Sequence, residues 1–80
     1  MDSAELALVR NLALRYPWPA NQNRYALALA LNGQPEEARR QLLVIRAQTH
    51  YNKRLYASVR DKWQEMAATQ YPQLKAVELP

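Results

Sequence analysis

A tract of alternating leucine and alanine, Tyr25 to Leu31, limits what this chain can fold into more than any other feature of its sequence. Alternation of apolar with polar residues would indicate a strand. Here both residue types are apolar and both favour helix, so the tract predicts a helix that is buried on most sides. Asn32-Gly33 is expected to end it, because glycine readily adopts the left-handed conformation that closes a helix. Pro35 fits the first position of the next helix, where its missing N–H costs nothing, so the sequence predicts a tight helical hairpin.

The length and composition are those of one small helical domain. Eighty residues are fewer than the roughly 100 to 150 typical of a domain, which excludes a two-domain enzyme. The chain is 49% hydrophobic and 22% charged, as in folded proteins, and it lacks phenylalanine. Because alanine and leucine dominate, we expect an all-α fold. We expect a single helical domain over residues 1–72 and a frayed C-terminal tail over residues 73–80.

Capping and helix-breaking residues set the expected boundaries of four helices. Asp2 is the expected cap of the first helix, and Pro17 stops it because proline disfavours helix in the residue before it. Either Asn21 or Asn23 is expected to cap the second helix, and Asn52 the fourth. The expected helices span residues 3–16, 22–32, 35–49 and 52–70.

Apolar residues that recur every three or four positions define the expected core. Small alanine side chains let neighbouring helices approach closely, while leucine, tyrosine and tryptophan fill the space between them. Trp63 lies on the inward stripe of the last helix, and Tyr56 is assigned to the same side, so both rings are expected to pack in the core. The expected core comprises Leu6, Val9, Leu12, Tyr25, Leu29, Ala38, Leu42, Ile45, Leu55, Val59, Trp63 and Met66.

Catalytic, cofactor and metal sites are not expected in this chain. It has no cysteine and one histidine, which excludes thiolate chemistry and pairs of histidine ligands. Asp61 and Glu65 lie one helical turn apart, but Arg60 and Lys62 adjoin them, so the pair does not indicate general acid–base chemistry. His50 is expected to interact with the C-terminal end of the third helix. The chain is therefore expected not to be an enzyme by itself.

The central hairpin resembles a tetratricopeptide repeat. With Gly33 at the glycine of that helix-turn-helix motif, the inward positions fall on Ala38, Leu42 and Ile45. A lone repeat cannot bury its own apolar faces, and about three stacked units are usually needed. The flanking helices must then cover the hairpin, so we expect a four-helix, tetratricopeptide-like bundle.

A more specific likeness lies between Arg24 and Leu42, which reads RYALALALNGQPEEARRQL. This run resembles the C-terminal soluble region of bacterial membrane-bound polymerases of the O-antigen ligase superfamily, the Wzy-like and pilin glycosylase type. In that family the region follows a bundle of transmembrane helices and is taken to lie on the periplasmic side. The whole protein transfers a lipid-linked oligosaccharide to an acceptor. Its catalytic residues lie in membrane-proximal loops that this sequence lacks, so none is carried over.

The resemblance implies that this chain is a non-catalytic, periplasmic accessory domain of a glycan polymerase or protein O-oligosaccharyltransferase. It would contact a partner protein, an acceptor or the membrane edge at the inner membrane, while its parent acts on the lipid-linked oligosaccharide. The alternative is a free-standing tetratricopeptide-like adaptor that binds a peptide. A nucleic-acid-binding protein is not expected, since the aromatic rings are assigned to the core.

Excess positive charge in the second half of the chain is the main candidate for a binding surface. The net charge is +4. At helical spacing Arg39 and Arg46 share a face, as do Lys53 and Arg60, and they could contact lipid phosphates or the pyrophosphate of a lipid-linked donor. The commoner interpretation is a solvated helix exterior. Trp18, between two prolines, either covers the end of the bundle or is exposed as an anchor for headgroups or a partner.

Overall fold

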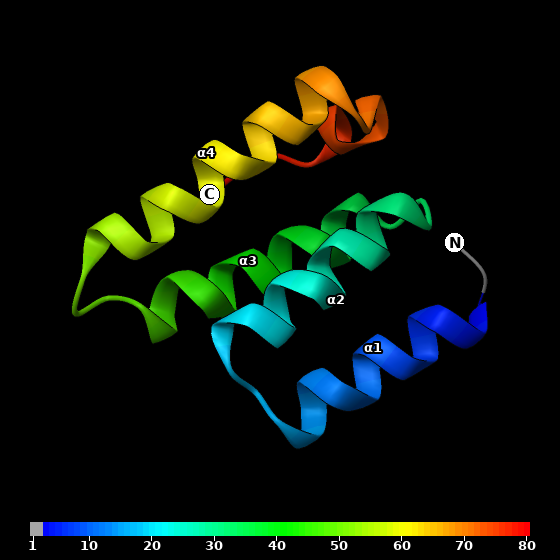
Figure 1. Cartoon of the computed structure of the whole chain (residues 1–80), viewed down its shortest axis with the longest axis horizontal. Helices are drawn as coiled ribbons and strands as arrows, with labels where there is room; N and C mark the ends of the chain where they lie inside the picture. The colour runs from blue at the N-terminus through cyan, green and yellow to red at the C-terminus, as the bar shows by residue number, and fades with distance from the viewer. Residues whose placement is uncertain (1–2) are drawn as a thin grey trace.

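The computed structural model describes residues 3–80, and over that range the chain forms four α-helices and a short 3₁₀ turn with no strand (Figure 1). The all-α fold and the number of helices are confirmed. Asp2, the expected cap of the first helix, lies outside the described residues. The elements are α1 (Ser3–Arg15), α2 (Pro19–Leu31), α3 (Pro35–Gln48), α4 (Lys53–Thr69) and the 3₁₀ turn η1 (Pro72–Ala76).

The α2–α3 hairpin forms as the sequence predicts, and the two helices lie side by side in Figure 1. Gly33 has a φ of +78°, the left-handed conformation. Its amide donates to the carbonyl of Ala30, and the amide of Gln34 donates to that of Leu29, so the turn satisfies two of the last carbonyls of α2. A Cβ at Gly33 would meet no atom within 4 Å. The backbone conformation, not crowding, therefore requires glycine here.

The start of α2 differs from the prediction. Pro19 is the first helical residue and Trp18 precedes it in extended conformation, with φ −80° and ψ 157°. The expectation that Asn21 or Asn23 caps this helix was wrong, because a proline at the first position starts the helix without a side-chain cap. Asn21 lies inside the helix, and its side-chain amide donates to the carbonyl of Tyr16 at 2.8 Å.

The cap of α4 is confirmed. The side-chain oxygen of Asn52 accepts a hydrogen bond from the backbone amide of Arg54 at 3.1 Å, and Asn52 itself is in extended conformation. This is the usual geometry of an asparagine N-cap. The helix consequently begins at Lys53, one residue after the expected start.

The core is centred on α3 and Trp63. Ala38, Leu42 and Ile45 are each 0% exposed, which confirms the predicted inward stripe. The Trp63 ring is 1% exposed, and its Nε1 donates to Oδ1 of Asn23 at 2.7 Å, joining α4 to α2. Tyr56 is also buried. The assignment of both rings to the core is therefore confirmed.

Two of the expected core residues are exposed, so their assignment was wrong. Leu12 is 36% exposed because α1 packs mainly against α2, through the buried Ala13, which turns Leu12 outward. Leu55 is 42% exposed because α4 presents the adjacent Tyr56 to the core instead. Both errors concern the rotation of an outer helix, which the helical period alone does not fix.

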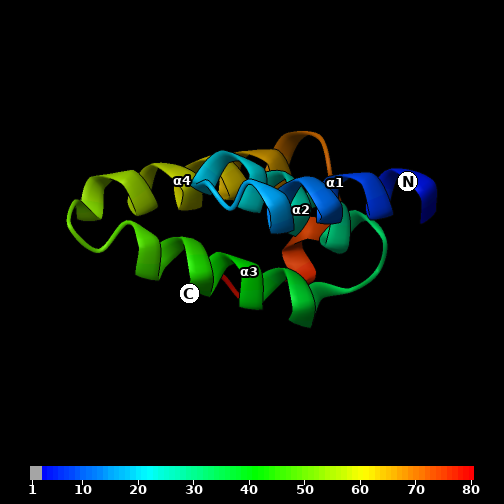
Figure 2. The same cartoon turned by 90° about the horizontal axis from the view of Figure 1, so that it is seen from below.

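The C-terminal segment is not frayed, contrary to the prediction. η1 packs against α4 and α2, and Leu74 and Val77 are both buried in the main core. Figure 2 shows α3 in one layer below α1, α2 and α4, with the red C-terminal segment running back toward α3. The prediction failed because Leu74 and Val77, three residues apart, fill the end of the core that the four helices leave open.

Candidate binding groove

A groove opens where the end of α3 meets the start of α4. Its volume is about 540 Å³. The chain reverses through residues 49–52, so the last two turns of α3 face the first turn of α4. We call this feature the α3–α4 groove, and it is lined by Leu43, Arg46, Ala47, Thr49, His50, Lys53 and Tyr56.

Two polar residues of the groove are used by the fold itself. The hydroxyl of Thr49 donates to the carbonyl of Ile45 at 2.8 Å. Nδ1 of His50 lies 2.8 Å from the carbonyl oxygen of Ala47, and because a carbonyl only accepts, Nδ1 carries the proton and donates. His50 therefore interacts with the C-terminal end of α3, as predicted. Neither of these bonded atoms is free for a ligand.

The charged residues that line the groove are both cations. Arg46 and Lys53 are exposed, and no carboxylate is among the lining residues. Leu43, Ala47 and the ring of Tyr56 supply apolar surface beside them. The groove thus combines an apolar lining with positive charge, which suits a ligand that carries both an apolar group and an anion.

Tyr56 has a hydroxyl that the fold leaves unpaired. The residue is 8% exposed, and its buried hydroxyl has no hydrogen-bond partner. Burial raises the pKa of Tyr56 above 10.0, and the positive charges of Arg46, Arg60 and Arg39 partly oppose that rise. The phenol is consequently neutral near pH 7. An unpaired buried hydroxyl costs about 1–3 kcal/mol, and this oxygen is buried too deeply to meet a ligand in the groove, so Tyr56 offers the groove its ring and not its O–H.

The structure brings together only two of the four predicted cationic contacts. Arg46 and Lys53 line the groove, whereas Arg60 and Arg39 do not. Arg39 is half-buried, its Nε lacks a hydrogen-bond partner, and it lines a separate hollow beside the C-terminal segment. Sequence reasoning missed Tyr56 as a site residue. Its spacing shows that it faces inward, but no sequence signal shows that its hydroxyl lacks an acceptor.

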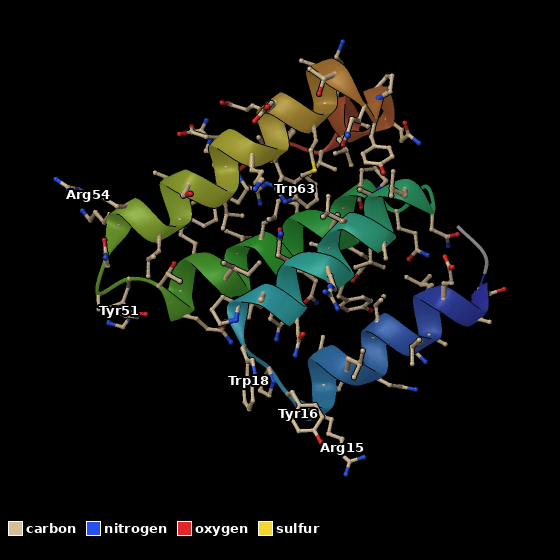
Figure 3. The ribbon with its side chains drawn as sticks, viewed as in Figure 1. Arg15, Tyr16, Trp18, Tyr51, Arg54 and Trp63 are labelled. Carbon is tan, nitrogen blue, oxygen red and sulfur yellow. The ribbon has the colours of Figure 1, made fainter. Side chains whose placement is uncertain are left out.

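Trp18 is exposed and does not cover the end of the bundle. Its side chain is 59% exposed, and its ring makes an edge-on contact with Tyr16, with centroids 5.7 Å apart. The guanidinium of Arg15 lies 5.5 Å from the centroid of the Tyr16 ring. Figure 3 shows these three side chains together at one end of the molecule, whereas Trp63 lies inside it.

Residues 3–80 contain no group of three or more histidine, aspartate or glutamate side chains that could hold a metal ion. None of the helices in this range combines the length and the apolar character that crossing a bilayer requires.

The fold and the groove define a small all-α domain built around an antiparallel helical hairpin, with a cationic, apolar groove at one end. The chain belongs to the family described as virulence factor membrane-bound polymerase, C-terminal, whose family model matches residues 1–70. It is thus a C-terminal domain of a membrane-bound polymerase, as the resemblance of the hairpin indicates. Val77 and the whole of η1 lie beyond the matched residues. No curated protein and no solved structure matches the chain.

Proposed function

We propose that this chain is a non-catalytic domain on the periplasmic side of the inner membrane that contacts an acceptor or another partner protein. Its parent would be a glycan polymerase or ligase, of the O-antigen ligase or protein O-oligosaccharyltransferase type, that acts on a lipid-linked oligosaccharide. Family membership supports the membrane-bound polymerase. The observation that carries the contact with a protein is the α3–α4 groove.

The groove suits a short segment of a partner with an acidic side chain next to an apolar one. Its volume, about 540 Å³, is large enough for a few side chains. A carboxylate would pair with Arg46 or Lys53. The neighbouring apolar side chain would cover Leu43 and Ala47. Each part of such a ligand therefore meets a complementary part of the groove.

Binding can be tested by NMR titration of the isotope-labelled chain with two short peptides. One has a central glutamate flanked by leucines, and the other has glutamine in place of the glutamate. Amide shifts are expected within residues 43–56, with binding of the glutamine peptide about tenfold weaker, since a hydrogen bond to a charged group contributes about 1.5–3 kcal/mol. Equal binding of both peptides, or shifts confined to other parts of the chain, would contradict the proposal.

Two variants refine this test. Arg46→Ala removes a cation that lines the groove and is expected to weaken binding of the glutamate peptide, whereas Arg10→Ala removes an exposed cation on α1 and is expected to leave it unchanged. Inorganic pyrophosphate is the competing probe. If pyrophosphate shifts the same residues and the glutamate peptide does not, the groove recognises phosphate and the proposed protein contact is wrong.

The role in the polymerase needs a separate measurement. Arg46→Ala and Lys53→Ala, introduced into the polymerase that carries this domain, should reduce glycan transfer to the acceptor without lowering the amount of enzyme in the membrane. If the parent chain binds the glutamate peptide but these variants leave glycan transfer unchanged, the alternative of an adaptor unrelated to glycan chemistry would be favoured.

A further inference from the structure

A rigid, exposed cluster of apolar and aromatic side chains lies where α1 joins α2. We call Leu14, Arg15, Tyr16 and Trp18 the aromatic tip. Leu14 is 73% exposed, Trp18 59% and Tyr16 40%. Figure 3 shows Arg15, Tyr16 and Trp18 projecting away from the body of the fold. Single exposed apolar residues need no explanation, but neighbouring ones of this size indicate a contact surface.

Hydrogen bonds fix the backbone of the tip. The amide of Trp18 donates to the carbonyl of Tyr16 at 2.8 Å, and that carbonyl also accepts from the side chain of Asn21. Nε2 of Gln48 donates to the carbonyl of Pro17 at 3.0 Å, which ties the connector to the end of α3. Prolines on both sides of Trp18 restrict the backbone further. The backbone that carries the exposed rings is therefore already fixed, which reduces the entropy lost when they bind a surface.

The outer face of α1 extends the tip. Leu8, Leu12 and Arg15 are spaced by four and three residues, so they share one face of the helix, and both leucines are exposed. α1 packs mainly against α2, and the outward leucines leave an apolar stripe that leads to the tip. Glu5 lies at the opposite end of the helix from the tip.

We propose that the outer stripe of α1 and the aromatic tip dock on a phospholipid surface. Tryptophan and tyrosine favour the headgroup level of a bilayer, where their apolar rings and polar atoms are both accommodated. Trp18 lies at the boundary between headgroups and acyl chains, and Arg15 pairs with a lipid phosphate. The net charge of +4 complements an anionic surface. A bilayer lies near this domain, because the family is that of a membrane-bound polymerase.

The inference rests on the tip and α1, not on the α3–α4 groove, so either proposal can fail without the other. The test is co-sedimentation of the chain with vesicles of phosphatidylcholine, alone or with about 30% phosphatidylglycerol. We expect binding that is stronger with the anionic lipid. Trp18→Ala is expected to reduce partitioning about tenfold, since a large exposed aromatic surface would no longer be removed from water. Tyr51→Ala is the matched control, because Tyr51 is an aromatic residue outside the tip that is more exposed than Trp18, at 73% against 59%.

Tryptophan fluorescence gives a second readout, in which Trp18 is retained and serves as the probe. In vesicles with brominated acyl chains, quenching is expected from exposed Trp18 and not from Trp63, whose ring is 1% exposed. Leu8→Ser, on the outer stripe and 60% exposed, should reduce this quenching while leaving the thermal unfolding of the chain unchanged. The proposal is wrong if neither lipid composition binds the chain, or if Tyr51→Ala weakens binding as much as Trp18→Ala. It is also wrong if sedimentation equilibrium shows a dimer that Trp18→Ala dissociates, because a second copy would then cover the tip.

Discussion

The hydrogen bond between Trp63 and Asn23 provides the sharpest test of how the helices are held together. It spans 2.7 Å and joins α4 to α2 across 40 residues of sequence. Trp63→Phe keeps an aromatic ring but loses this bond, worth about 1 kcal/mol, and leaves unfilled volume in a fully packed site, worth about 1–2 kcal/mol. The free energy of unfolding should therefore fall by about 2–3 kcal/mol, which for a domain of this size lowers the Tm by about 15 °C.

A double-mutant cycle isolates the hydrogen bond from the packing. Asn23→Ala leaves the buried indole N–H without an acceptor and should cost about 1–3 kcal/mol in the parent chain. The same change should cost much less once Trp63 is phenylalanine, giving a coupling free energy of about 1 kcal/mol. Chemical denaturation monitored by circular dichroism measures all four proteins. A coupling below about 0.3 kcal/mol would refute the reasoning, because distant independent residues add within that range.

Three further substitutions test other parts of the fold. Ala38→Leu inserts a larger side chain at a 0% exposed position and should cost about 1–3 kcal/mol, and an unchanged Tm would contradict the assigned inward stripe of α3. Gly33→Ala should cost about 1–2 kcal/mol in urea denaturation from its φ of +78° alone, since space for the methyl group exists. Tyr56→Phe should be neutral or slightly stabilising near pH 7, because it removes a buried hydroxyl that has no partner. Burial raises the pKa of Tyr56 above 10.0, so above about pH 10 the phenol ionises more readily in the unfolded chain than in the folded one. The parent chain should therefore lose stability as the pH rises through this range. Tyr56→Phe lacks the phenol, so its stability relative to the parent should increase there, as measured by urea denaturation.

The two proposed surfaces are physically connected through the end of α3. Gln48 lies between Ala47 and Thr49, which line the groove, and its side chain holds the carbonyl of Pro17 beside the aromatic tip. If both proposals hold, docking of the tip on lipid orients the groove relative to the membrane surface. Gln48→Ala would test this link, because it should loosen the connector without removing any residue that lines the groove.

Local features of the sequence predicted the hairpin well. The Leu/Ala tract, Gly33 and Pro35 each favour one backbone conformation without any need of distant residues, so the turn between α2 and α3 follows from chemistry within a few positions. The cap at Asn52 was predicted for the same reason. The prediction for the start of α2 was wrong, because two signals compete there and Pro19 starts the helix ahead of the asparagines that follow it.

The sequence by itself determined the helical class, the number of helices and the turn at Gly33, because these depend on interactions within a few residues. Only the tertiary structure decided how α1 and α4 rotate, which exposes Leu12 and Leu55, and that Leu74 and Val77 complete the core. It also decided that the Tyr56 hydroxyl is left unpaired beside Arg46. Such features depend on which surfaces of distant segments meet, and the free energy of that packing is shared among all of them rather than set at any one position.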